Sequence, residues 1–464
     1  MAALVGEVPP PTKPQEESKT SGLTTWGSVE LPEMPAQSTE LRERIKVSIR
    51  WALSGEAILE DVSMERSAPL WQVRALVAEQ LDEECAFQMI YGSITLVGPY
   101  TISELGITNG ANILVLLSGP HFALSSSADG TAKIWNAETG QCLQTFDPEQ
   151  TQVRTAAFSP DGEFILTARM RVAKIWRVET NECIHVLEDH VAPVCTAEFS
   201  PDGRWVVTGS VDFTAKIWSL ETGECKVTLH GHTRQVGSAV FSPSSDVVLT
   251  ASLDRTARSW DAESGECLQV FAQVDVPLTS AAYSPCGTLA IIAATDCLAR
   301  ILHFESDGTL VNLAGHFGPV CSAAFSPNGY MAITGGGDSL AMIWISHTGE
   351  LLLTLEGHKG PVTSAAFSPD AQLAITASGD KTAKLWSAEN GVCFRTITVH
   401  LRPLCSVMFH PKVQRAPGKD SNEQAQGVTW AGWPAANTEA YVPVFPEAER
   451  RRHCGVCDLG CRLS

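Results

Sequence analysis

Histidine, aspartate and tryptophan recur together at constant distances along this sequence. In each set an Asp follows a His by 22 residues, and a Trp follows that Asp by six. A single His–Asp pair is typical of a general base and its orienting group. An enzyme needs one such pair, so several copies favour a structural network that gives partners to buried polar groups. The complete sets are His190, Asp212 and Trp218; His232, Asp254 and Trp260; His316, Asp338 and Trp344; and His358, Asp380 and Trp386.

The tryptophans belong to a repeat of about 42 residues that runs from Thr131 to Trp386. An aromatic residue followed by Ser-Pro opens a turn in most repeats, as at Phe158 and Phe199, and Pro and Gly suit such turns because of their backbone angles. A repeat of this length with strands and turns predicts propeller blades rather than a helical solenoid. The marker positions are Trp135, Trp176, Trp218, Trp260, Trp344 and Trp386, with Phe304 in the one remaining place.

These features together make residues 119–411 resemble the WD-repeat propeller family. The Trp-Asp dipeptide that names the family is present at Trp260-Asp261. In that family the His of a repeat bonds the Asp of a turn, and a Ser or Thr links the pair to the Trp indole. The resemblance therefore implies that the His–Asp–Trp sets are a structural network and not catalytic residues.

Six repeats are complete, and fragments at the two ends of the repeat region supply parts of a seventh. Residues 122–146 hold three strands without a first strand, whereas Leu404–Phe409 is a first strand without followers. Because closure of a propeller removes exposed sheet edges, we expect the fragments to join. The alternative is that Ala111–Leu117 supplies the missing strand, although that segment fits the preceding domain better. The union predicts a fifth set, formed by His400, Asp129 and Trp135.

The segments outside the repeats differ from them in pattern. Residues 44–118 contain two alternating strands, a helical spacing at 69–81 and further strands, an order that resembles the ubiquitin-like (β-grasp) fold. Residues 1–43 are rich in Pro, Glu, Ser and Thr, and residues 412–464 lose the repeat, so we expect two disordered tails. The expected fold class is mainly β: a seven-bladed WD-repeat β-propeller preceded by a small α+β ubiquitin-like domain.

The composition limits the classes of function. A formal net charge of −19 over 464 residues argues against binding to nucleic acid or to an anionic membrane. The first residues lack the pattern of a secretory signal, and no apolar run approaches the roughly 20 residues that span a bilayer. Five of the 14 cysteines share one repeat position, so they are not natural disulfide partners. Reduced cysteines and a cytoplasmic location are therefore expected.

Loops on the His/Asp side of the predicted propeller carry cations, whereas the opposite turns carry glutamates. Complementary charge steers association, so an acidic peptide is the expected partner of this side. Arginine and aromatic residues are the strongest candidates for such a contact. Arg169 and Arg171 also stand where a repeat has lost its turn Asp, and functional sites are where local rules fail. The predicted contact residues are Arg169, Arg171, Arg234, Phe317, Lys359 and Arg402.

In the ubiquitin-like segment, the resemblance places Ile90 in the hydrophobic patch that ubiquitin receptors recognise. This implies a protein of the ubiquitin-receptor type as a second partner. In the C-terminal tail, His453, Cys454, Cys457 and Cys461 resemble half of a zinc site. These four residues are crowded for one tetrahedral ion, so no metal site is expected.

The leading hypothesis is a non-catalytic scaffold for protein–protein interaction. The propeller face would bind a peptide or protein, and the ubiquitin-like module would dock a second partner. The sequence lacks a phosphate-binding loop, a zinc-protease motif and a serine-hydrolase elbow, so we expect no enzyme activity and no cofactor. One alternative is a ubiquitin-system regulator or adaptor that acts through the ubiquitin-like domain. The repeats also resemble those of dynein-assembly and centriolar WD-repeat proteins, so such a factor is a second alternative, although this likeness is general and does not choose a pathway.

Overall fold

The structure is a computed structural model that describes residues 44–411, apart from 53–55, 82–86, 93, 97–100, 118–120, 148–150, 272–274 and 305–309. The two expected tails lie outside the described residues, and so does the group that begins at His453. Within the described part of the chain, one α-helix accompanies 33 strands.

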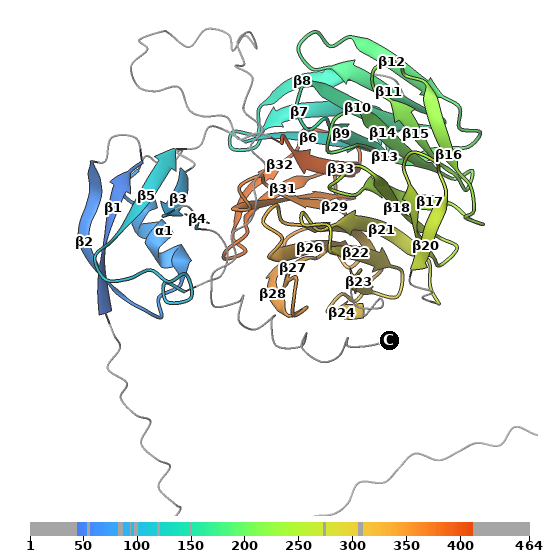
Figure 1. Ribbon diagram of the computed structural model, residues 1–464. Coiled ribbons are helices and arrows are strands. Elements are labelled where there is room, and N and C mark those ends of the chain that lie inside the picture. Colours follow the sequence, from blue (N-terminus) through green and yellow to red (C-terminus); the bar gives the residue numbers. More distant parts are fainter. Residues whose placement is uncertain are drawn as a thin grey trace, which may run out of the picture. The chain divides into compact units, whose positions relative to one another are not determined.

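The N-terminal part is a five-stranded sheet with one helix (Figure 1). Its strand order is β2-β1-β5-β3-β4, with β1 and β5 parallel. Leu70, Val73 and Val77 recur at helical spacing and are fully buried, so this side of the helix packs into the core. The elements are β1 (Arg44–Trp51), β2 (Ala57–Glu65), α1 (Leu70–Ala78), β3 (Phe87–Tyr91), β4 (Ile94–Thr95) and β5 (Ala111–Leu117).

The rest of the described chain forms seven four-stranded antiparallel sheets, numbered here 1 to 7 (Figure 1). Sheet 1 contains β6 (Phe122–Ser127), β7 (Ala132–Asn136), β8 (Cys142–Phe146) and β33 (Leu404–Phe409). Sheet 2 contains β9 (Thr155–Phe158), β10 (Phe164–Arg169), β11 (Val172–Arg177) and β12 (Cys183–Glu188). Sheet 3 contains β13 (Val194–Phe199), β14 (Trp205–Ser210), β15 (Ala215–Ser219) and β16 (Cys225–Leu229).

The remaining four sheets follow the same order along the chain. Sheet 4 contains β17 (Val236–Phe241), β18 (Val247–Ser252), β19 (Ala257–Asp261) and β20 (Cys267–Phe271). Sheet 5 contains β21 (Leu278–Tyr283), β22 (Leu289–Ala294), β23 (Leu298–His303) and β24 (Leu310–Ala314). Sheet 6 contains β25 (Val320–Phe325), β26 (Met331–Gly336), β27 (Ala341–Ile345) and β28 (Leu351–Leu355), and sheet 7 contains β29 (Val362–Phe367), β30 (Leu373–Ser378), β31 (Ala383–Ser387) and β32 (Cys393–Ile397).

Sheet 1 is assembled from opposite ends of the repeat region. β33 pairs with β6, and the register places Leu404 opposite Ser127 and Phe409 opposite Ala123. The expected union of the two fragments is therefore present. The alternative is wrong, because Ala111–Leu117 is β5 and pairs with β1 and β3 of the N-terminal sheet. The innermost strands contact one another in the cyclic order β33, β9, β13, β17, β21, β25, β29 and back to β33.

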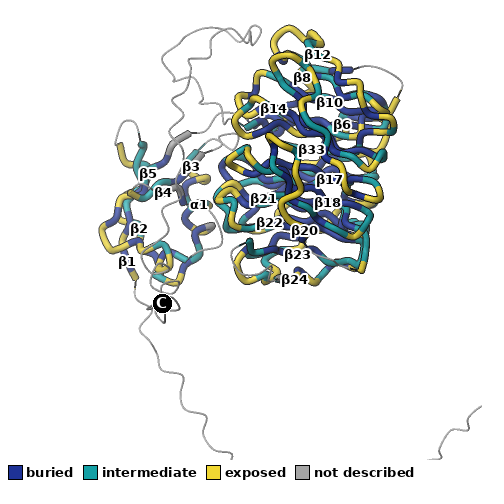
Figure 2. Tube along the Cα trace, turned by 45° about the vertical axis from the view of Figure 1, so that its right-hand side comes forward, coloured by how far each residue is buried: buried dark blue, intermediate teal, exposed yellow. Residues whose placement is uncertain are grey.

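The core of the sheets contains two kinds of residue: small residues on the second strands and the repeated tryptophans on the third strands. The second strands are buried along their whole length in sheets 1 and 6, where β6 and β26 consist mostly of small and medium-sized residues. Figure 2 draws buried residues in dark blue, and these run through the sheets, whereas exposed residues in yellow lie mostly in the connecting turns. Four of the repeated tryptophans are among the largest fully buried side chains. An aromatic side chain buries roughly 150–250 Å², so the residue that marks the repeat in the sequence also fills the core. These four are Trp135, Trp260, Trp344 and Trp386.

Candidate functional site

The structure brings each complete His–Asp–Trp set together as one hydrogen-bonded chain. In sheet 3, Nδ1 of His190 lies 2.7 Å from Asp212, and its Nε2 lies 2.8 Å from the hydroxyl of Thr208. The indole N–H of Trp218 donates to the same hydroxyl at 2.8 Å. The chain runs from a turn through the imidazole to the middle of the sheet, so it ties a loop to the core.

Four other sheets repeat this arrangement with little variation. The Nδ1–carboxylate distances are 2.8 Å for His232–Asp254, 2.8 Å for His316–Asp338, 3.0 Å for His358–Asp380 and 2.9 Å for His400–Asp129. The last pair joins residues from opposite ends of the repeat region, and Nε2 of this His lies 2.8 Å from Ser125, which also accepts the indole N–H of Trp135 at 3.0 Å. In sheets 4, 6 and 7 the hydroxyls belong to Thr250, Thr334 and Thr376, and the indoles to Trp260, Trp344 and Trp386.

The protonation of these pairs fits a structural role. Burial lowers the pKa of His190 and His400 more than their carboxylate partners raise it, so both imidazoles are neutral at pH 7. Burial alone would raise the pKa of Asp254, but hydrogen bonds from Thr256, Thr233 and His232 bring it down to about 2. A neutral imidazole donates to the aspartate through Nδ1 and accepts the hydroxyl proton at Nε2. Both nitrogens are therefore occupied, and neither is free to act as a base on a substrate.

The same aspartates position the residue that follows each histidine. Asp338 accepts the backbone N–H of Phe317 at 2.9 Å, and Asp129 accepts that of Leu401 at 3.2 Å. Although large and apolar, Phe317 is 89% exposed and Leu401 is 85% exposed. The equivalent positions in sheets 3, 4 and 7 are Val191, Thr233 and Lys359, each held by its own aspartate. The network therefore fixes the backbone from which these side chains extend into solvent.

Most of the predicted contact residues lie on the surface. The side chains of five of the six are exposed and are carried by the turns and loops on the His/Asp side of the sheets. These five are Arg171, Arg234, Phe317, Lys359 and Arg402.

Arg169 does not belong to this surface and corrects the prediction. Only 4% of it is exposed, and its guanidinium pairs with Asp147, which is 1% exposed. Asp147 also lies 3.4 Å from Lys174 and accepts the hydroxyl of Thr167 at 3.5 Å. A buried carboxylate needs a cationic partner, and this need holds Arg169 inside the sheet.

Sheet 2 therefore keeps the network with exchanged charges. The hydroxyl of Thr167 accepts the indole N–H of Trp176 at 2.9 Å, as its counterparts do elsewhere. A loop aspartate, Asp147, replaces the histidine, and Arg169, the last residue of β10, replaces the aspartate as its charged partner. In sheet 5, Asp296 keeps its place but pairs with Arg300, which is 8% exposed. Sequence reasoning missed Asp147 and Arg300, and the repeat gave no signal for either, because other sheets also carry a cation at the position of Arg300 and an exposed acid at that of Asp147.

A different buried histidine supports sheet 1 on the side away from the His/Asp loops. Nδ1 of His121 lies 3.2 Å from Glu138, and its Nε2 lies 3.3 Å from Asp370 in sheet 7. Burial would lower the pKa of this imidazole, but hydrogen bonds with the two carboxylates raise it to about 9. His121 is therefore a cation at pH 7 that links sheet 1 to its neighbour.

One carboxylate lies on an innermost strand. Glu198 of β13 is reached by solvent, yet desolvation by the protein around it raises the pKa of its carboxyl to about 7. Both observations agree with a side chain that points into a narrow, protein-walled space along the axis of the sheets. The equivalent residues on the other innermost strands are Ala157, Val240, Ala282, Ala324, Ala366 and Met408. Glu198 therefore has no second acid or nucleophile beside it at this level among the described residues.

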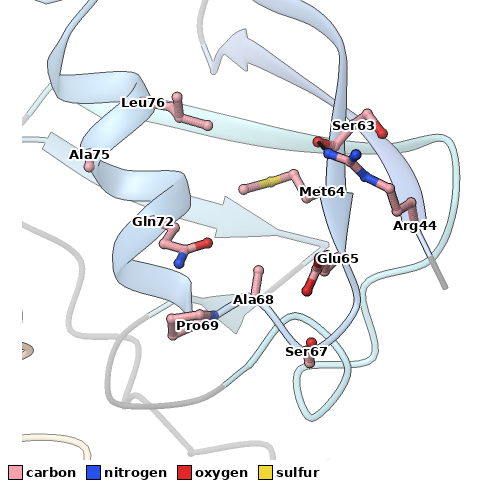
Figure 3. A pocket seen from close by; sticks show the side chains of 10 residues that line it. All are labelled: Arg44, Ser63, Met64, Glu65, Ser67, Ala68, Pro69, Gln72, Ala75 and Leu76. Atoms are coloured by element: carbon pink, nitrogen blue, oxygen red, sulfur yellow. Dashed lines mark hydrogen bonds between the residues drawn. The ribbon is translucent and has the colours of Figure 1, made fainter. Parts of the chain in front are cut away.

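The N-terminal part has a hollow of about 630 Å³ between β2 and α1 (Figure 3). Met64, Ala68, Pro69 and Leu76 supply its apolar lining, and Arg44 stands at its rim. The predicted contact residue Ile90 lies elsewhere, half-buried on β3. Among the described residues, no cluster of His, Cys, Asp and Glu has the arrangement of a metal site. The one described helix is too short to cross a membrane.

The exchanged pair in sheet 2 predicts a large difference between two neighbouring arginines. Arg169→Met removes the more deeply buried of the two cations beside Asp147, leaves Lys174 in place, and should lower the free energy of unfolding by about 3 kcal/mol. Arg171→Met is the matched control, because Arg171 is exposed, and should change it by less than about 0.5 kcal/mol. Urea denaturation of both variants checks this. Equal effects would contradict the buried pair.

The histidine network predicts a loss of stability on acidification. The folded-state pKa of His190, His232, His358 and His400 lies below the ordinary 6.5. The unfolded chain therefore takes up protons first as the pH falls, and stability that is complete above pH 6.5 is lost below it. Glu198, Glu389 and His121 have raised folded-state pKa values and act in the opposite direction, but they are outnumbered by the four histidines. Thermal unfolding should show Tm falling from pH 6.5 to about 5, and a rising Tm would contradict the assignment.

Two protein-family models match the repeat region. Residues 115–341 match the family model described as IFT122 first beta-propeller, and residues 349–387 match WD domain, G-beta repeat. Eukaryotic translation initiation factor 3 subunit I of Meyerozyma guilliermondii is 42% identical over 55 residues, which is 12% of this chain and 16% of the relative. WD repeat-containing protein 25 of Mus musculus is 48% identical over 48 residues, 10% of this chain and 9% of the relative. The aligned segments thus span a small part of each relative, and the chain carries a β-propeller of the WD-repeat family.

Proposed function

We propose that this chain is a non-catalytic, cytoplasmic scaffold whose seven sheets are the blades of one WD-repeat propeller. The cyclic contacts of the innermost strands and the assembly of sheet 1 from both ends of the repeat region support a closed ring of seven. Among the described residues, the cysteines are free thiols, which suits a reducing compartment. The His–Asp pairs are fully engaged in the network, which supports a role without catalysis.

The observation that carries the proposal is the presentation of exposed side chains on the His/Asp side. Phe317 and Leu401 expose large apolar surface, yet their backbones are held by Asp338 and Asp129. A backbone that is already held loses little conformational freedom on binding, and large apolar side chains form the anchors of protein interfaces. The exposed cations around them, Arg171, Arg234, Lys359 and Arg402, favour an acidic partner segment. WD-repeat propellers in general bind other proteins, and one relative is named as a subunit of a larger factor.

We also propose that residues 44–118 are a ubiquitin-like module that docks a second protein. The strand order β2-β1-β5-β3-β4, with one helix after the first two strands, supports this assignment. Half-buried Ile90 would then lie on the recognition surface of the module. A ubiquitin-system regulator that acts through this module is the alternative function. The reported relatives do not bear on dynein assembly or centrioles, so that interpretation stays a prediction.

Affinity purification of the tagged full chain with quantitative mass spectrometry tests the proposal. Phe317→Ala and Lys359→Glu should each reduce the captured partner about tenfold, because they remove an anchor and reverse a charge on the proposed face. Glu263→Lys is the matched charge-reversal control, since Glu263 is exposed in a turn on the opposite side. Full capture by both face variants would contradict the proposed face. Loss of capture with Ile90→Asp alone would support the ubiquitin-type alternative instead.

A further inference from the structure

Sheet 2 differs from the other six sheets in the turn that faces the proposed partner. Four residues lie between the paired Ala168 and Ala173, whereas five lie between the corresponding pair in sheet 3, Gly209 and Ala215. The other five sheets also have five residues at this place. The shorter turn has no aspartate, and no histidine loop is tied to it. Sheet 2 therefore lacks the aspartate turn and the histidine loop that cover this end of sheet 3.

A hollow of about 310 Å³ lies beside this shorter turn. Met170 stands at the tip of the turn, 59% exposed and with a positive φ of 43°, and exposed Pro193 comes from the neighbouring loop. Val191 of the same loop is 76% exposed. The turn that carries Met170 and the loop that carries Val191 and Pro193 thus both expose apolar side chains beside the hollow. The hollow is lined by Thr151, Gln152, Arg154, Met170 and Pro193.

Arg154 is the one charged residue among those that line the hollow. The guanidinium of Arg154 donates to the sulfur of Cys195 at 3.2 Å, and the amide of Gln235 donates to the same sulfur at 3.1 Å. Burial raises the pKa of Cys195, so this thiol is neutral and does not balance the charge of Arg154. Arg171 is exposed next to Met170. Among the residues that the structure describes, no carboxylate pairs with either Arg154 or Arg171.

We infer that the hollow beside the sheet 2 turn is the anchor site of the partner-binding face, and that it takes a peptide segment with a large apolar side chain next to a carboxylate. The apolar side chain enters between Met170 and Pro193, and the carboxylate meets Arg154. The volume is at the lower end of small-molecule pockets, roughly 300–1,000 Å³, so the site suits one side chain better than a drug-sized ligand. This inference rests on the proposed function and specifies the chemistry of its partner.

A phage-displayed library of random 12-residue peptides, about 10⁹ members in size, selected on the immobilised full chain tests the inference. We expect enrichment of sequences that hold Asp or Glu beside Leu, Met or Phe. The most enriched peptide is then synthesised, and its Kd is measured by fluorescence polarisation against four variants. Selection of no peptide, or of sequences without an acidic residue, would overturn the inference.

The variants are chosen so that the fold is preserved. Met170→Gly removes the apolar side chain, and Gly tolerates the positive φ of this position. Arg154→Gln removes the charge but keeps an N–H donor for Cys195. Each should raise Kd about tenfold. Arg177→Gln, at the opposite end of β11, is the matched control and should leave Kd unchanged.

The remaining outcomes separate this inference from the proposed function. If Met170→Gly and Arg154→Gln leave Kd unchanged while Phe317→Ala raises it, the partner-binding face stands and the anchor site at sheet 2 is overturned. If all three leave Kd unchanged, the proposed face fails together with the anchor site.

Discussion

The pairing of β33 with β6 is the interaction on which the rest of the propeller depends. It joins residues separated by 280 positions, such as Ser126 and Ser406, whose hydroxyl oxygens lie 2.8 Å apart. Without this ladder, β6 would be an exposed edge strand, and β29 and β9 would each lack a neighbour. The closing strand also brings His400 to Asp129, so the polar network of sheet 1 exists only in the closed ring. Ring closure therefore decides both the core and the surface of sheet 1.

Stability and surface presentation share the same side chains. Each aspartate of the network accepts one bond from a buried imidazole and another from the backbone of an exposed residue, as Asp338 does with His316 and Phe317. Loss of one of these aspartates would therefore remove a hydrogen bond to a buried imidazole and another to the backbone of an exposed loop residue. Sheets 2 and 5 satisfy their buried charges with arginine–carboxylate pairs instead, so their rims are free to differ.

Much of the fold could be predicted because the same residue types recur at the same positions of each repeat, and each type has a narrow structural role. Trp, the Ser-Pro turns and the His–Asp spacing each fix a strand, a turn or a bond, and the strand pairing of β33 followed from edge closure. The burial of Arg169 could not be predicted, since it depends on Asp147 from the preceding sheet, and this contact has no counterpart in the other repeats. The raised pKa of Glu198 likewise depends on its burial by the strands around the axis of the sheets, and the spacing of residues in the sequence does not reveal this burial.

Disulfide formation across the closing ladder tests the central claim most directly. Ser126 and Ser406 are directly paired in antiparallel strands, where Cα atoms about 4.5–5.5 Å apart suit a disulfide. The full chain with both Ser126→Cys and Ser406→Cys is oxidised and digested, and the peptides are analysed by mass spectrometry, with each single variant as the control for native thiols. The closed ring predicts a disulfide-linked peptide that joins the two positions within one molecule. Two free thiols at these positions in the folded double variant would contradict it.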